Sequence, residues 1–207
     1  MSLMGSVRRG VALLVVLVIG AVVVGCGSNS EASGPTTEST FQGLVIQPPR
    51  AAPALALRDY KGRAVNLAAF RGQAVLVTFV YTHCPDVCPL IVTNLAAAQR
   101  ELASEARHLQ IIAVTVDPVR DTPRAVEEFL AKRRATGAVD YLIGSRKQLL
   151  PIWKAWGIAV STNKYEQAEG HTAVVFGITP SGKIVVAYPS TFTPADIVHD
   201  VPLLARN

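Results

Sequence analysis

Two cysteines, Cys84 and Cys88, lie in the segment THCPDVCP, which directly follows an apolar, β-branched run. A strand that ends in such a turn and then enters a helix can present sulfur at the helix N-terminus, where negative charge is stabilised. That environment favours the thiolate, the form of cysteine that attacks disulfides and binds metals.

The four-residue spacing of these cysteines is compatible with two kinds of chemistry. On a regular helix such a pair has its Cβ atoms about 5 to 6 Å apart, whereas a disulfide requires about 4 Å. The start of a helix or a turn can close that gap. A metal ion can bridge it instead, because each metal–sulfur bond adds about 2.3 Å. Dithiol redox chemistry and soft-metal binding both stay open, and the spacing favours metal more than Cys-x-x-Cys would.

His171 is a candidate third ligand, in Gly170-His171-Thr172 between a polar loop and an expected strand. Two soft sulfurs and one imidazole nitrogen form a ligand set suited to copper or zinc. The alternative is that His171 is an ordinary surface histidine with no ligand role.

Asp117 is a candidate supporting residue, because it ends the apolar run LQIIAVTV and is followed by Pro118. One interpretation is that its carboxylate orients His171 or tunes the sulfurs from behind. The other is that it is simply the first residue of an Asp-Pro turn.

The elements that must position these residues follow from periodicity and from turn and cap residues. A hairpin is expected over 55–67, with its turn at 59–62. Further strands are expected at 74–81, 109–116, 141–144, 172–178 and 183–188. Helices are expected from 90 to 107, from Thr122 to about Thr136, from Ser145 to Trp156, and from Thr193 to about Leu204, and 159–170 is expected to be a polar loop.

Alternating strands and helices imply an α/β sheet that is covered by helices. A chain that closes with a hairpin and a helix has the thioredoxin-like arrangement. We therefore expect a thioredoxin-like fold with a mixed central sheet, flanking helices and an N-terminal β-hairpin extension. In that fold the loop before the strand at 172–178 faces the two-cysteine turn, which would bring His171 to the sulfurs.

The N-terminus has the pattern of a secretory signal. Arg8 and Arg9 precede an apolar stretch at 11–24, which is shorter than the roughly 20 residues that span a bilayer. Val23-Val24-Gly25-Cys26 also resembles a bacterial lipobox, in which the cysteine becomes the lipidated first residue. The alternative is an uncleaved signal anchor.

The chain is accordingly predicted to comprise a signal peptide at 1–25, a lipidated Cys26 with a flexible tether at 26–40, and a thioredoxin-like copper-binding domain at 41–207. The predicted location is the extracytoplasmic face of the cell membrane, held by the lipid anchor. The formal charge is +5, but its positive residues are scattered and form no long run, so nucleic acid is not an expected partner.

Three segments together resemble the SCO1/SenC family: YTHCPDVCP at 81–89, VDPVRDTP at 116–123, and His171. The resemblance covers roughly 41–205 and implies a thioredoxin-like protein that assists assembly of the copper centre of cytochrome c oxidase. It also implies that copper is the metal and that the family's ligands correspond to Cys84, Cys88 and His171.

The leading hypothesis is a membrane-tethered metallochaperone that delivers copper to the copper-site subunit of cytochrome c oxidase. The alternative is an enzyme, a thiol-disulfide oxidoreductase that reduces the cysteines of the apo-oxidase copper site, for which His171 would be dispensable. Either function requires a thiol-disulfide reductant as a partner, because only the reduced pair can bind metal or act as a reductant. A peroxidase and a purely structural disulfide are weaker interpretations.

Overall fold

The computed structural model describes residues 40–207. The predicted signal peptide, the lipidation site at Cys26 and nearly all of the tether lie outside the described residues. Across 40–207, no helix combines the length and apolar character that a membrane crossing requires.

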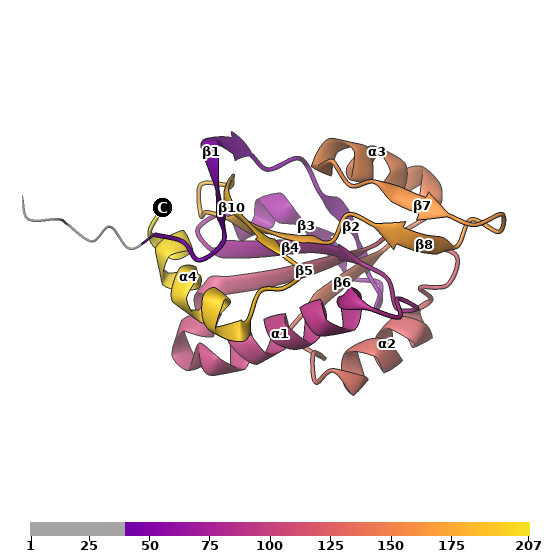
Figure 1. Cartoon of the computed structure of the whole chain (residues 1–207), viewed down its shortest axis with the longest axis horizontal. Coiled ribbons are helices and arrows are strands. Elements are labelled where there is room, and N and C mark those ends of the chain that lie inside the picture. Colours follow the sequence, from indigo (N-terminus) through magenta and orange to yellow (C-terminus); the bar gives the residue numbers. More distant parts are fainter. Residues whose placement is uncertain (1–39) are drawn as a thin grey trace, which may run out of the picture. The chain divides into compact units, whose positions relative to one another are not determined.

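One eight-stranded mixed sheet organises the domain, in the order β1-β10-β9-β4-β5-β6-β2-β3 (Figure 1). β4, β5 and β6 are parallel, and every other neighbouring pair is antiparallel. The strands are β1 (Leu44–Ala51), β2 (Ala56–Asp59), β3 (Ala64–Asn66), β4 (Ala74–Val80), β5 (Leu109–Thr115), β6 (Asp140–Ile143), β9 (Val174–Ile178) and β10 (Lys183–Pro189). This arrangement confirms the thioredoxin-like fold, with the β2–β3 hairpin added at one edge.

β4 lies at the centre of the sheet because its sequence, AVLVTFV, is apolar on both faces. All seven of its residues are buried, as expected for a strand that is covered by helices on both sides. β4 delivers the chain to the cysteine turn, so the most deeply buried strand fixes the position of the sulfurs.

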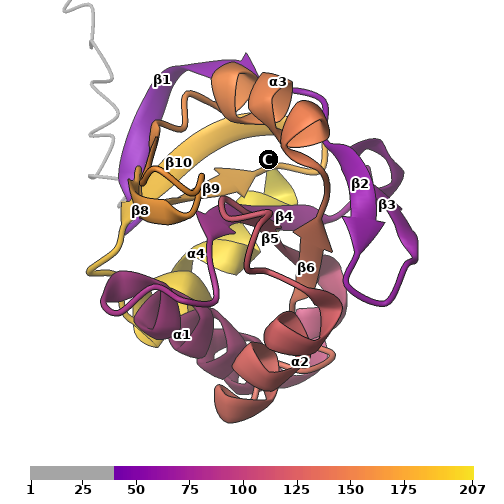
Figure 2. The same cartoon turned by 90° about the vertical axis from the view of Figure 1, so that its right-hand side faces the viewer.

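Helices cover both faces of the sheet (Figures 1 and 2). α1 (Val87–Glu101), α2 (Pro123–Lys132) and α4 (Pro194–Arg206) lie on one face, and α3 (Arg146–Trp156) lies on the other. The predicted caps are present: the hydroxyl of Thr122 accepts from the N–H of Ala125, and Ser145 and Thr193 each form a capping box. These caps satisfy backbone N–H groups that have no partner inside the helix.

Three boundaries, at the two ends of α1 and the end of α2, differ from the prediction. α1 begins at Val87 rather than Leu90, because Pro89 falls in the first turn, where a missing N–H costs little. The helix then ends at Glu101 and continues only as a 3-10 segment, Ala103–His108. α2 ends at Lys132, short of the predicted Thr136.

Two strand regions were missed by sequence reasoning. No strand was assigned to the segment leading into the domain, but β1 forms there as an edge strand, where Pro48 and Pro49 are tolerated. The expected polar loop contains a separate two-stranded sheet of β7 (Val160–Thr162) and β8 (Ala168–His171). The side chain of Asn163 organises its turn by accepting from the N–H groups of Tyr165 and Gln167.

Aromatic packing joins α3 to the sheet. The ring of Trp156 lies 5.7 Å from that of Phe79 on β4 and 5.6 Å from that of Phe176 on β9, centroid to centroid. Trp153 is also buried, and its indole N–H donates to the carbonyl of Thr115. The two tryptophans therefore belong to the core, as their helical spacing predicts.

Gly177 on β9 should not tolerate a side chain. A Cβ at this position would collide with Val186 on β10 and crowd Leu204 on α4. We expect Gly177→Ala to lower the free energy of unfolding by about 1 to 3 kcal/mol through overpacking, as measured by urea denaturation. Adding Val186→Ala, which removes the colliding methyl groups, should recover part of the loss, and a double variant no more stable than Gly177→Ala would contradict this explanation.

Candidate functional site

The two cysteines lie on the turn between β4 and α1. The N–H of Cys84 donates to the carbonyl of Tyr81 at 3.3 Å, which closes a tight turn at the end of the strand. Cys88 is in the first turn of α1. Both are free thiols and both are buried, Cys84 with 8% and Cys88 with 0% of its surface exposed. Of the two cysteines, only Cys84 has access to solvent.

The two sulfurs differ strongly in acidity. The interaction with the Cys88 thiol lowers the pKa of Cys84 to about 5, against the opposing effect of burial. The backbone N–H groups of Cys88 and Asp86 lower it further. The same thiol interaction and burial raise the pKa of Cys88 above its ordinary value. At neutral pH, Cys84 is a thiolate and Cys88 carries the proton.

The imidazole of His171 reaches this pair from the end of β8. Its Nε2 lies 3.3 Å from the sulfur of Cys88, and its Nδ1 lies 2.9 Å from the carbonyl oxygen of Thr172. Since a carbonyl can only accept, Nδ1 carries the proton and Nε2 presents its lone pair to the sulfur. Burial lowers the pKa of His171, so the ring is neutral at neutral pH. The predicted convergence of His171 on the cysteines is present.

The separation of His171 and Cys88 is close to that of two ligands sharing a metal. Bonds of about 2.3 Å to sulfur and 2.0 Å to nitrogen place the two atoms about 3.5 Å apart at a tetrahedral angle. Within residues 40–207, no three His, Cys, Asp or Glu side chains already form a complete metal-binding group. A three-ligand site would therefore require an adjustment of these side chains.

Asp117 is buried and pairs with Arg120, and its hydrogen bonds do not reach His171. Arg120 in turn donates from Nη2 to the carbonyl of Ala168 on β8 at 2.6 Å, and its guanidinium lies 5.9 Å from the ring centroid of Tyr81. The predicted orienting role of Asp117 stays a prediction, and the route that the contacts offer runs through Arg120 and the strand that carries His171.

Asp121 is a residue whose role sequence reasoning missed. Its carboxylate accepts from the N–H and hydroxyl of Thr82, at 2.9 and 2.7 Å, and from the hydroxyls of Thr115 and Tyr141, at 2.6 and 2.7 Å. Burial raises its pKa. The sequence signal was only that Asp121 precedes a helix cap. In the structure it fixes the backbone two residues before Cys84.

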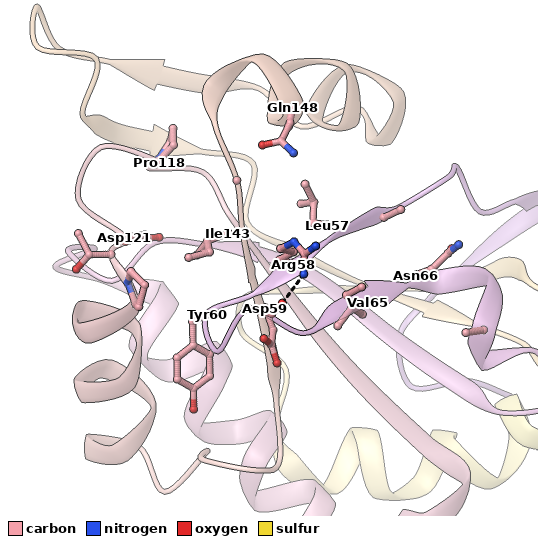
Figure 3. A pocket seen from close by; sticks show the side chains of 17 residues that line it. Leu57, Arg58, Asp59, Tyr60, Val65, Asn66, Pro118, Asp121, Ile143 and Gln148 are labelled. Carbon is pink, nitrogen blue, oxygen red and sulfur yellow. Dashed lines mark hydrogen bonds between the residues drawn. The ribbon is translucent and has the colours of Figure 1, made fainter.

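Two pockets lie near these elements. A pocket of about 870 Å³ is formed by the β2–β3 hairpin, β6 and the start of α2 (Figure 3). None of Cys84, Cys88 and His171 lines it. A more open hollow of about 330 Å³ borders His171 on the β7–β8 hairpin. Of these two, only the hollow on the β7–β8 hairpin borders a proposed site residue, His171.

The tie between Arg120 and β8 can be tested with Arg120→Lys. Lysine keeps the charge beside Asp117 but lacks the forked guanidinium that also reaches Ala168. We expect amide hydrogen exchange across Ala168–His171 to accelerate about three- to tenfold, with β4 unchanged. Arg124→Lys, on the exposed side of α2, is the matched control. Unchanged exchange in β8 would show that Arg120 does not hold this hairpin.

The chain resembles known proteins over most of its described length. The SCO1/SenC family profile matches residues 46–206. The mitochondrial protein SCO2 homolog of Bos taurus is 29% identical over 153 residues, which are 70% of this chain but only 56% of that protein.

Two solved structures share the fold. Apo Sco1 from Thermus thermophilus has 27% identity and a TM-score of 0.69, covering 81% of this chain and 99% of that one. ScoI from Bradyrhizobium japonicum, solved with copper bound, has 25% identity and a TM-score of 0.66, covering 75% and 99%. The family profile spans the cysteine turn, the histidine-bearing hairpin and all but the first residues of the sheet, and this chain belongs to the SCO1/SenC family.

Proposed function

We propose that this chain is a metallochaperone that binds one copper ion through Cys84, Cys88 and His171 and delivers it to the copper-site subunit of cytochrome c oxidase. The observation that carries the proposal is the 3.3 Å approach of the His171 Nε2 to the Cys88 sulfur, beside the second sulfur of the turn. The copper-bound relative with the same fold adds support.

The donor set suits copper as a cargo. Thiolates are soft ligands that favour Cu(I), and imidazole also accepts copper. Three protein ligands leave a position open, at which a ligand of the receiving protein can bind before the donor ligands leave. At neutral pH, Cys84 and His171 already present lone pairs, so Cys88 is the only one of the three that must lose a proton.

The same cysteines give the site a redox gate. A disulfide between Cys84 and Cys88 would have no thiolate left for metal, so loading requires the reduced pair. We accordingly propose a thiol-disulfide reductant as a second partner. Attachment to the extracytoplasmic face of a membrane through a lipid on Cys26 is part of the proposal and rests on the N-terminal sequence pattern.

Copper binding tests the ligand set. In the reduced full chain carrying Cys26→Ser, we expect one Cu(I) per chain, with release of about one proton at neutral pH, since only Cys88 is protonated beforehand. His171→Ala should weaken binding about 100-fold or more, because it removes a direct ligand, and Cys88→Ser should weaken it further. Competition with a Cu(I) chelator measures these affinities.

The matched control is His108→Ala, which removes an exposed histidine far along the chain from the cysteine turn. It should bind Cu(I) with the same affinity as the parent protein, the Cys26→Ser chain. Equal affinity in His171→Ala and the parent would remove His171 from the ligand set. No binding by the reduced parent would remove the copper function itself.

A second candidate function is a thiol-disulfide oxidoreductase, favoured by the unequal acidity of the two cysteines. Cys84, as the thiolate and the more accessible of the two sulfurs, would attack a disulfide sulfur and form a mixed disulfide. Cys88 would then lose its proton, attack the Cys84 sulfur and release the second thiol of the substrate. The substrate gains two electrons, and the Cys84–Cys88 pair becomes a disulfide.

The acidity of Cys84 can be read from its alkylation rate. Because only the thiolate reacts, the rate with iodoacetamide in the Cys26→Ser chain should rise through pH 5 and be level by neutral pH, following the pKa of about 5. In Cys88→Ala, which removes the main cause of the lowering, the midpoint should move upward toward the ordinary value of about 8.5. A midpoint near 8.5 in both proteins would contradict the thiolate assignment.

A further inference from the structure

A pocket of about 270 Å³ lies between α2 and the residues that immediately precede Cys84. It is lined by Thr82, His83, Ala125, Glu128, Phe129, Lys132 and Arg133. Neither the proposed copper ligation nor the core packing explains it.

Arg133 is the unusual member of this pocket. Its Cζ lies over the ring of Phe129, 3.7 Å from the centroid, and its Nη1 donates to the carbonyl of Phe129. Its Nε is buried and has no hydrogen-bond partner in the described chain. Among residues 40–207, no carboxylate forms an ion pair with Arg133.

The other charges around the pocket do not neutralise Arg133. Glu128, the one acidic residue in the lining, is bonded to Arg124 at 2.9 Å and is also attracted by Lys132. Burial lowers the pKa of Arg133. Of the neighbouring groups that act against this lowering, only the Cys84 thiolate is charged at neutral pH, and it offsets the cost only in part. A partly desolvated guanidinium without a counter-ion is unfavourable unless an anion arrives to pair with it.

We propose that this pocket is an anion subsite that receives the carboxylate of an acidic side chain next to the cysteine of a partner protein that exchanges at Cys84. Guanidinium groups bind carboxylates with directed, charge-assisted hydrogen bonds. Lys132 adds a second positive charge at the rim. The volume lies below the roughly 300 to 1,000 Å³ of typical small-molecule sites, so it suits one side chain rather than a free cofactor.

The position of the pocket decides its role. Thr82 and His83 form part of its wall and lead directly into Cys84. An acidic side chain held on Arg133 would therefore place its neighbouring cysteine at the sulfur with solvent access. This inference deepens the exchange proposed above for Cys84, but its test needs no copper, so the two proposals can fail separately.

The test compares two disulfide reagents on the reduced full chain with Cys26→Ser. Dithiobis(nitrobenzoate) carries carboxylates, and dithiodipyridine is neutral. In each case the Cys84 thiolate attacks one sulfur, the S–S bond breaks, and its electron pair leaves on the aryl thiolate. Cys88 then loses its proton and attacks Cys84, releasing the second aryl group. The absorbance of the released aryl product gives the rate.

The measured quantity is the rate with the carboxylate reagent divided by the rate with the neutral one. Arg133→Gln should lower this ratio about three- to tenfold, since it removes the attraction for the carboxylate. Arg134→Gln makes the same charge change at the next, exposed residue, which does not line the pocket, and should leave the ratio within about twofold. The ratio cancels any general change in Cys84 reactivity.

An unchanged ratio in Arg133→Gln would overturn the proposal, whether both rates fall together or neither falls. If the ratio fell equally in Arg133→Gln and Arg134→Gln, the proposal would also be overturned, because the fall would then reflect net charge alone. If Arg133→Gln does not fold, Lys132→Gln should lower the ratio, and high ionic strength should lower it in the parent. A parent ratio that does not respond to salt would overturn the proposal without any variant.

Discussion

The site depends on the hydrogen bond that the Cys88 thiol donates. The thiol faces two acceptors, the thiolate of Cys84 and the Nε2 of His171, and its proton can be donated to only one of them at a time. While it is donated to Cys84, it keeps that sulfur ionised, and the Nε2 of His171 lies close to the same thiol. A soft cation placed among the same atoms would take over that role, because it accepts electron density from all three. The reduced site is therefore already organised around a shared proton.

Two buried carboxylates hold the elements that meet at this proton. Asp121 fixes Thr82 and so the start of the cysteine turn, and it also joins β5 and β6 through Thr115 and Tyr141. Asp117 acts on β8, the strand that carries His171, because Arg120 pairs with Asp117 and donates to the carbonyl of Ala168. Both carboxylates come from the short segment after β5. That segment sets the relative placement of sulfur and imidazole, although it contributes no ligand.

Much of the fold was predictable, because buried strands such as β4 and capped helices such as α3 carry strong local signals. The cysteine pair and His171 were predictable as candidates from residue type and spacing. The β7–β8 hairpin was not, since its polar sequence gives no alternation and its turn depends on the side chain of Asn163. The function of Asp121 was hidden for a related reason: its four donors come from three segments that only the folded sheet brings together.

The hairpin that carries His171 is a small sheet of its own, outside the eight-stranded sheet that supports the cysteines. The sulfurs are therefore attached to a large sheet, and the imidazole is attached to a much smaller and less stable one. Two strands alone are only marginally stable, so once the Arg120 bond to Ala168 breaks, the hairpin can open while β4 and α1 keep their structure. In the copper site proposed above, nitrogen would then dissociate before sulfur. The lifetime of the loaded state would depend on the fluctuations of a few residues and would be largely independent of the global stability of the domain.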